Sequence, residues 1–121
     1  MKNRWVLLEH KLSAGKLVDI HYDFLVEDEI ECLTWKFLEI PLLNKGFVEI
    51  VRQPNHRLIW LSRLQCELSR DRGVVQRIDH GTFKNVSPKL DFQELKLILD
   101  GKLLNGIFEI SGNFCKLTKN L

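Results

Sequence analysis

One segment of the sequence places an imidazole and a carboxylate where they could act together. Residues 18–27 read Val-Asp-Ile-His-Tyr-Asp-Phe-Leu-Val-Glu, and apolar or aromatic side chains occupy every second position from Val18 to Val26. Successive side chains of a β-strand point to opposite faces, so His21 and Asp23 project together from the face opposite the apolar one. A divalent cation accepts imidazole nitrogen together with carboxylate oxygen. The pair therefore predicts a metal platform, although solvent-facing strands also carry such residues without an ion.

A third ligand is available from the strand that precedes this one. His10 follows the apolar residues 5–8, and residues 11–16 contain small and flexible side chains that suit a return between two paired strands. With a second imidazole the set favours Mn²⁺ or Zn²⁺ over Ca²⁺. Glu9 is a candidate for orienting a ligand or a catalytic group from behind, and it is equally compatible with a solvated strand end.

Composition and charge limit the class of protein. The 121 residues are 45% hydrophobic, which is enough to build one core in one domain that spans residues 1–121. The formal net charge is only +2, so any basic surface has to be local. Six arginines and two acidic residues lie between positions 51 and 77. They could form a phosphate-facing patch or a solvated set of charges.

Cysteine usage and the lengths of the apolar runs indicate a reduced, internal compartment. The cysteines are odd in number and never form a CxxC pair, which argues against a disulfide framework and against a zinc knuckle. The apolar run that follows the first four residues is too short for the core of a signal peptide, and no run approaches the roughly 18 apolar residues of a membrane span. We therefore expect a cytoplasmic protein without a membrane partner. The cysteines are Cys32, Cys66 and Cys115.

Alternation with period two dominates the chain, and no segment has the pattern of a long amphipathic helix. Short strands need closure to protect their edges, so the sequence predicts an all-β protein with little helix: a small closed or crescent-shaped barrel of about eight mostly antiparallel strands. The dipeptide Asp100-Gly101 predicts a two-residue hairpin turn, and residues 111–113 predict a second turn. Residues 38–45 and 84–92 are expected to be loops. The expected strands are 4–9, 17–27, 29–37, 47–52, 57–61, 73–79, 94–99, 104–110 and 114–117.

Six short motifs, taken in order, resemble the 3′-phosphoesterase domain of bacterial DNA ligase D. Residues 4–10 form an apolar strand that ends in His, and residues 21–27 resemble the family's His-aromatic-Asp-Phe strand, which closes on an acidic residue. Order and spacing agree over nearly the whole chain. The other four motifs are 33–37 with a central Trp, 55–60 with a second His, 79–83 (Asp-His-Gly-Thr-Phe) and 103–108 (Leu-Leu-Asn-Gly-Ile-Phe).

The resemblance implies a function for these residues. It implies a barrel with a crescent groove that holds Mn²⁺, with Zn²⁺ or Co²⁺ as further options, and that trims ribonucleosides and phosphates from the 3′ ends of DNA or RNA–DNA strands in repair. Carried over position by position, metal ligation falls to His10, His21 and Asp23. Catalysis falls to His56 together with His21 and Asp23. We expect a monomer whose partners are nucleic-acid 3′ ends and DNA-repair proteins.

Two positions depart from the family's pattern and leave an alternative open. Leu25 stands where the family has Arg, and Trp60 stands where it has Tyr; both missing groups would contact phosphate oxygens. Trp60 could instead stack a terminal base or ribose. Arg52, Arg57 or residues 70–72 could supply the missing charge. The alternative is a catalytically inactive barrel that binds nucleic-acid ends or a protein partner.

Overall fold

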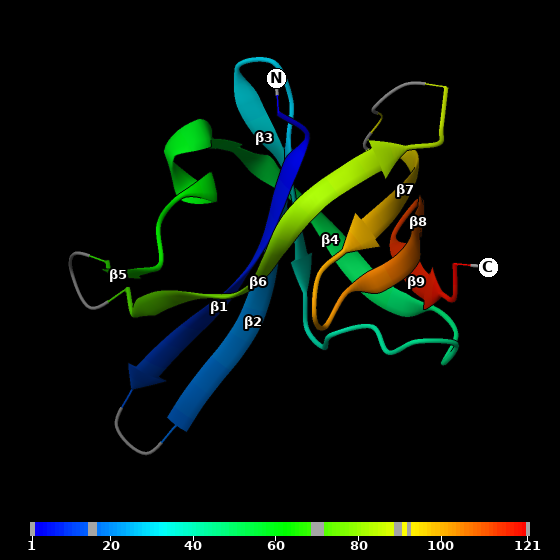
Figure 1. Ribbon diagram of the computed structural model, residues 1–121. Helices are drawn as coiled ribbons and strands as arrows, with labels where there is room; N and C mark the ends of the chain where they lie inside the picture. Colours follow the sequence, from blue (N-terminus) through cyan, green and yellow to red (C-terminus); the bar gives the residue numbers. More distant parts are fainter. Residues whose placement is uncertain (1, 15–16, 69–71, 89–90, 92, 121) are drawn as a thin grey trace.

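The computed structural model describes residues 2–14, 17–68, 72–88, 91 and 93–120, which form nine strands and one short 3₁₀ helix (Figure 1). None of the helical structure in these ranges is long and apolar enough to cross a lipid bilayer. The elements are β1 (Arg4–Ala14), β2 (Leu17–Glu27), β3 (Glu31–Phe37), β4 (Val48–Arg57), η1 (Leu58–Leu61), β5 (Gln65–Glu67), β6 (Val74–Asn85), β7 (Glu94–Asp100), β8 (Asn105–Ser111) and β9 (Phe114–Thr118).

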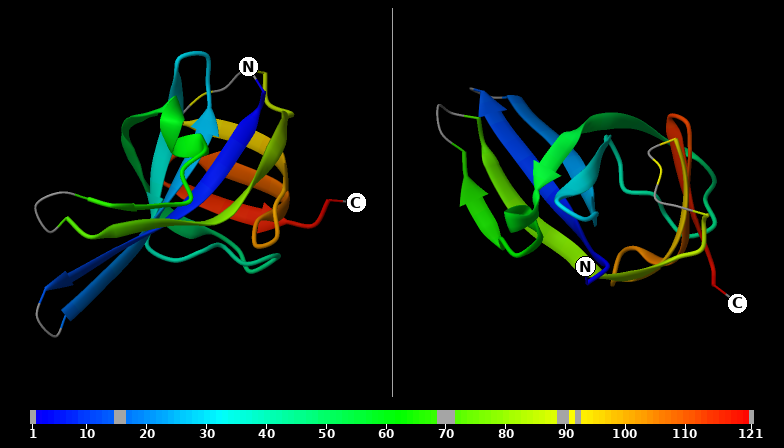
Figure 2. Two further views of the ribbon diagram at one scale, coloured as in Figure 1. Left: turned by 60° about the vertical axis from the view of Figure 1, so that its left-hand side comes forward. Right: turned by 90° about the horizontal axis from the view of Figure 1, so that it is seen from above.

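The strands pair antiparallel and the sheet closes on itself. The order β1-β2-β3-β4-β9-β8-β7-β6 returns to β1 through the β1–β6 pairing, and β5 is attached to β6 outside this ring. Beyond the ring, the end of β1 and the start of β2 continue away from the barrel as a hairpin (Figures 1 and 2). The prediction of a small all-β barrel with little helix is confirmed.

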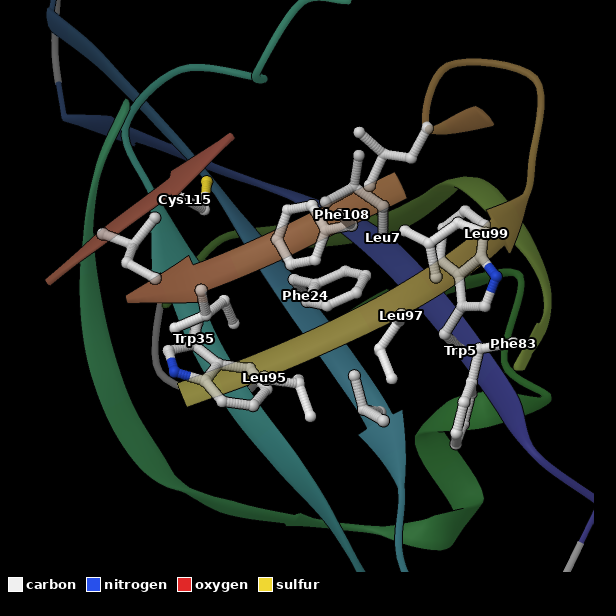
Figure 3. Close-up of a cluster of buried hydrophobic side chains, with 14 of the residues drawn as sticks. Trp5, Leu7, Phe24, Trp35, Phe83, Leu95, Leu97, Leu99, Phe108 and Cys115 are labelled. Carbon is white, nitrogen blue, oxygen red and sulfur yellow. The ribbon is translucent and has the colours of Figure 1, made fainter. Parts of the chain in front are cut away.

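Aromatic side chains fill the inside of the barrel. Phe24 lies at the centre of this core, with its ring centroid 4.8 Å from that of Phe108 and 5.5 Å from that of Phe37. Trp5 and Trp35 pack on the same ring and are fully buried (Figure 3). Burial of such side chains, at about 25 cal/mol per Å² of apolar surface, is the main term that stabilises the fold.

The apolar face predicted for β2 is only partly buried. Phe24 and Val26 belong to the core, but Val18 is 60% exposed and Ile20 is 37% exposed. These two residues lie in the part of the β1–β2 hairpin that extends past the barrel, where β3 no longer pairs with β2. The alternation was therefore predicted correctly, and the burial of its first residues was not.

One predicted strand is wrong. Residues 57–61 do not form a strand, because β4 continues to Arg57 and the chain then turns into η1. In a 3₁₀ helix side chains three apart lie on the same side, and here Leu58 and Leu61 both pack against apolar residues outside the barrel. The structure also contains β5, which was not predicted. In addition, β6 continues to Asn85, into a segment that was expected to be a loop.

The turn predicted at Asp100-Gly101 is longer than two residues. Asp100 pairs with Asn105, so the β7–β8 loop spans residues 101–104. The buried carboxylate of Asp79 holds this loop, accepting backbone N–H bonds from Lys102 at 2.9 Å, Leu103 at 2.9 Å and Leu104 at 2.8 Å. The second predicted turn is confirmed, since Ser111 pairs with Phe114 across residues 112 and 113.

Replacing Asp79 by Asn should lower the free energy of unfolding by about 2–3 kcal/mol, because an amide NH₂ would face backbone N–H donors in a buried site. Urea denaturation measures the change. Glu109→Gln is the control, since this carboxylate is on the surface and forms ion pairs with Lys96 and Lys116. It should cost less than about 0.5 kcal/mol. Equal losses for the two variants would contradict the role given to Asp79.

Candidate metal centre

The candidate site lies on the outside of the barrel. Pairing of β1 with β2 places Leu8 opposite Asp23 and His10 opposite His21, on the faces that point away from the aromatic core. The predicted polar face of β2 is therefore present. It is not open to solvent throughout, because Asp23 is only 9% exposed and Leu25 is fully buried.

A second apolar cluster explains this burial. We call it the outer cluster, and η1 covers it with Leu58 and Trp60. Leu25, at the position where the resembling family has Arg, points into this cluster, where a guanidinium would be excluded from water. The outer cluster also shields the neighbouring Asp23 from solvent. Its buried members are Val6, Leu8, Leu25, Cys32, Leu61 and Val75.

Three side chains converge at the edge of the outer cluster. His10 Nδ1 lies 3.2 Å from His21 Nε2, and His21 Nε2 lies 3.6 Å from Asp23 Oδ1. One ligand atom from each residue is within 4.8 Å of the other two. Bonds of about 2.1 Å to a common ion separate neighbouring ligand atoms by about 3.0 Å in an octahedron and about 3.4 Å in a tetrahedron. The separations of 3.2 Å and 3.6 Å are close to these values, and the three groups could hold one divalent ion.

A backbone carbonyl sets the tautomer of His10. His10 Nε2 lies 2.7 Å from the carbonyl oxygen of Arg72, which can only accept a hydrogen bond. Nε2 therefore carries the proton, and the lone pair of Nδ1 faces His21. Glu9 was the residue predicted for such a supporting role, but the structure places it on the opposite face of β1, with its carboxylate 3.5 Å from Lys11 Nζ.

Burial acts on the charges of the site. It raises the pKa of the Asp23 carboxyl, and positive charge on His21, His56, His10 and Lys36 opposes that rise only in part. Burial also lowers the pKa of the His21 imidazole, against the attraction of Asp23. Both shifts favour the neutral form, so the protein alone does not compensate the Asp23 carboxylate fully. A divalent cation would supply the missing charge.

A small cavity of about 90 Å³ is lined by two of the three candidate ligands, His10 and Asp23. The pairing of His56 with Cys32 brings His56 to it, and the turn into η1 brings Trp60. His56 Nδ1 lies 3.0 Å from the carbonyl oxygen of Pro54, which leaves Nε2 as the nitrogen free to meet a ligand. The lining residues are Leu8, His10, Asp23, His56, Trp60, Leu68 and Val75.

The arginines predicted to contact substrate are not gathered here. The guanidinium of Arg52 donates to the carbonyl oxygen of Thr34 at 2.9 Å and lies over the ring of Trp35, on the other face of the sheet. Arg57 is exposed at the end of β4, opposite Glu31. Positions 70 and 71 lie outside the described residues. Arg72 contributes its backbone carbonyl.

Two further basic residues lie near the site: Lys36, which the sequence did not single out, and Arg63, which is one of the six arginines in residues 51–77. Lys36 of β3 stands directly opposite Asp23 on the same outer face. It is half-buried, and no ion pair is recorded for it within the described part of the chain. Its charge acts on both His21 and Asp23. Arg63 places its guanidinium 5.0 Å from the centre of the Trp60 ring. That these two residues lie near the site follows only from the strand register and the η1 turn.

Comparisons with known proteins add no family assignment to this geometry. No protein-family model matches the sequence, and no curated protein matches it. The resemblance to the phosphoesterase domain of DNA ligase D stays a prediction based on the six motifs.

Replacing Asp23 by Asn should abolish Mn²⁺ binding and also stabilise the metal-free protein, raising its melting temperature at pH 7 by on the order of 3 °C. Burial raises the pKa of Asp23 above its ordinary value of 3.8, so the ionised carboxylate lowers stability above the folded-state pKa. As the pH falls through that pKa and then below 3.8, the penalty disappears and the two melting curves should converge.

Calorimetric Mn²⁺ titration and thermal unfolding test both parts of this prediction. Asp19→Asn is the matched control, because Asp19 lies on the same face of β2 and is exposed. It should keep Mn²⁺ binding and gain no stability. An Asp23→Asn protein that melts lower and still binds Mn²⁺ would show that this carboxylate is structural.

Proposed function

We propose that this protein is a metal-dependent phosphoesterase that processes the 3′ ends of DNA or RNA–DNA strands, as a cytoplasmic monomer that works with DNA-repair proteins. The observation that carries the proposal is the convergence of His10, His21 and Asp23 within 4.8 Å beside a cavity that also contains His56. Three protein ligands leave coordination positions open for a reacting group, whereas structural metal sites are closed by protein.

The donor set suits Mn²⁺ best, and it also accepts Zn²⁺ or Co²⁺. When bound, the ion supplies positive charge that offsets the negative charge building up on the phosphoryl group. Asp23 and the imidazoles of His10 and His21 would hold that charge beside the cavity. His56 reaches the same cavity with its Nε2. In its protonated form it would donate to the leaving oxygen or hold a non-bridging one.

The groups around the cavity favour an anionic, nucleotide-like substrate. Lys36 offers an ammonium on the face that carries Asp23, and Leu25 cannot supply such a charge. Trp60 lines the cavity, with the guanidinium of Arg63 over its ring, and a terminal base or ribose could stack against that indole. A cavity of about 90 Å³, roughly the volume of three water molecules, admits a phosphate group and leaves the rest of the strand outside.

A second candidate is a barrel that binds nucleic-acid ends or a protein partner without turnover. The burial of Leu25 and the lack of a hydroxyl on Trp60 favour it, because Leu25 has no hydrogen-bond donor and Trp60 cannot replace the hydroxyl of the Tyr that the resembling family has there. Such a protein would keep the metal and the positively charged residues around it, but it would not turn over a substrate.

With Mn²⁺, the purified protein should convert a primer–template carrying a 3′-phosphate or a 3′-terminal ribonucleotide to a shorter or dephosphorylated strand that ends in a 3′-hydroxyl. His21→Ala should lower the rate by at least about 100-fold, because it removes a metal ligand. His80→Ala, which removes an exposed imidazole from β6, should leave the rate unchanged. Gel electrophoresis of labelled primers measures the product.

The outcomes separate the two candidates. Salt-sensitive binding of the primer without product would support the second candidate. Equal turnover by the wild type and His21→Ala would contradict the proposed phosphoesterase site. Absence of both metal binding and nucleic-acid binding would contradict the phosphoesterase and the binding of nucleic-acid ends, and would leave a barrel that binds a protein partner.

Replacing Lys36 by Gln should raise KM for a 3′-phosphorylated primer by about tenfold, the loss expected for one charge-assisted contact worth about 1.4 kcal/mol. Lys36→Arg should restore most of that loss. Lys96→Gln serves as the control, because Lys96 pairs with Glu109 on the surface of β7 and β8. A KM that is unchanged by Lys36→Gln would exclude Lys36 from substrate binding.

A further inference from the structure

We infer that Gly73 is a positioning residue of the metal centre: it lets the chain that enters β6 pass so close to β1 that the carbonyl of Arg72 fixes His10 with Nδ1 facing the ion. The inference rests on the proposed metal site and adds to it the device that orients one ligand. It concerns a residue with no side chain, just before β6, whereas the three candidate ligands come from β1 and β2.

The approach of the two segments at Gly73 leaves no room for a side chain. Gly73 has φ +95°, a conformation that L-amino acids rarely adopt. A Cβ built there would lie 2.1 Å from the carbonyl oxygen of Lys11 and 3.2 Å from Cα of Leu12. Both neighbours are backbone atoms, which cannot rotate away. Any side chain at position 73 must therefore push the β6 segment away from β1.

Arg72, the residue before Gly73, accepts the hydrogen bond from His10. Val74, which follows Gly73, pairs with Lys11 at the end of the β1–β6 register, and Arg72 lies beside the side chain of His10. Its carbonyl oxygen lies 2.7 Å from His10 Nε2. A separation of the two segments large enough to relieve the contact at Gly73 would lengthen this hydrogen bond beyond useful geometry.

The hydrogen bond decides which nitrogen of His10 faces the site. With Nε2–H donated to a carbonyl, Nδ1 keeps its lone pair, and that atom is the one 3.2 Å from His21 Nε2. Metal-binding histidines commonly donate their second nitrogen in this way, and loss of the acceptor typically weakens metal affinity by about 10–100-fold. Without the carbonyl, the ring of His10 is free to rotate or to carry its proton on Nδ1, which would block ligation.

Gly73→Ala tests the inference, and Gly46→Ala is its matched control. Gly46 also has a positive φ, +87°, but a Cβ there meets nothing within 4 Å. Nitrogen-15 NMR of the metal-free proteins at about pH 8, where imidazoles are neutral, reports the His10 tautomer. Calorimetric titration with Mn²⁺ reports affinity. We expect the Nε2–H tautomer in the wild type and in Gly46→Ala, with equal Mn²⁺ affinities. In Gly73→Ala we expect mixed tautomers and an affinity lower by about 10–100-fold.

Two results would overturn the inference. One is an Nδ1–H tautomer of His10 in the metal-free wild type, which decides the matter even if Gly73→Ala does not fold. The other is a folded Gly73→Ala protein with the tautomer and the Mn²⁺ affinity of the wild type. A wild type that shows the Nε2–H tautomer but binds no Mn²⁺ would contradict the proposed function and leave the positioning of His10 by Arg72 supported.

Discussion

The register between β1 and β2 sets both the core and the candidate site. It places His10 opposite His21 on the outer face and, further along, Leu7 opposite Phe24 on the inner face. Because side chains alternate along a strand, a slip of one residue in β2 would turn Phe24 out of the barrel and His21 into it. Packing of the aromatic core therefore fixes the strand register, and the register fixes the positions of the candidate ligands. Closure of the barrel through β1–β6 adds the second constraint, since it brings the chain before β6 over His10.

The outer cluster gives the site its chemical character. By covering Leu25 and the flank of Asp23, η1 creates a partly dry pocket on a face that would otherwise be wet. A carboxylate held there is unfavourable in the metal-free protein and favourable with a cation. Asp23 therefore lowers the stability of the metal-free protein while it serves the proposed metal site. The same cover excludes an arginine from position 25. Positive charge for the proposed substrate would have to come from elsewhere, and the register places Lys36 of the neighbouring strand opposite Asp23.

Local patterns predicted what depends on a single segment. The faces of β2, the extent of most strands and the turn at residues 112 and 113 follow from alternation and turn chemistry, and the structure confirms them. His10 was found from its residue type and its place before the return to β2, although β1 does not end at residue 9 and continues to Ala14, through most of the segment expected to form that return. The 3₁₀ turn at residues 58–61 was not found, because an apolar run has the same composition in a strand and in a helical turn, and only packing on the outer cluster decides between them. Long-range contacts were also out of reach. Neither the Asp79 bonds to the β7–β8 loop nor the Arg72 carbonyl on His10 leaves a local sequence signal.

The most direct test of the account is a crystal structure of the wild-type protein grown with Mn²⁺, with anomalous diffraction used to locate the ion. The account predicts one strong anomalous peak about 2.2 Å from His10 Nδ1, His21 Nε2 and Asp23 Oδ1, with His10 Nε2 still donating to the carbonyl of Arg72. A structure in which these three atoms diverge, or in which Mn²⁺ occupies only other positions, would contradict it.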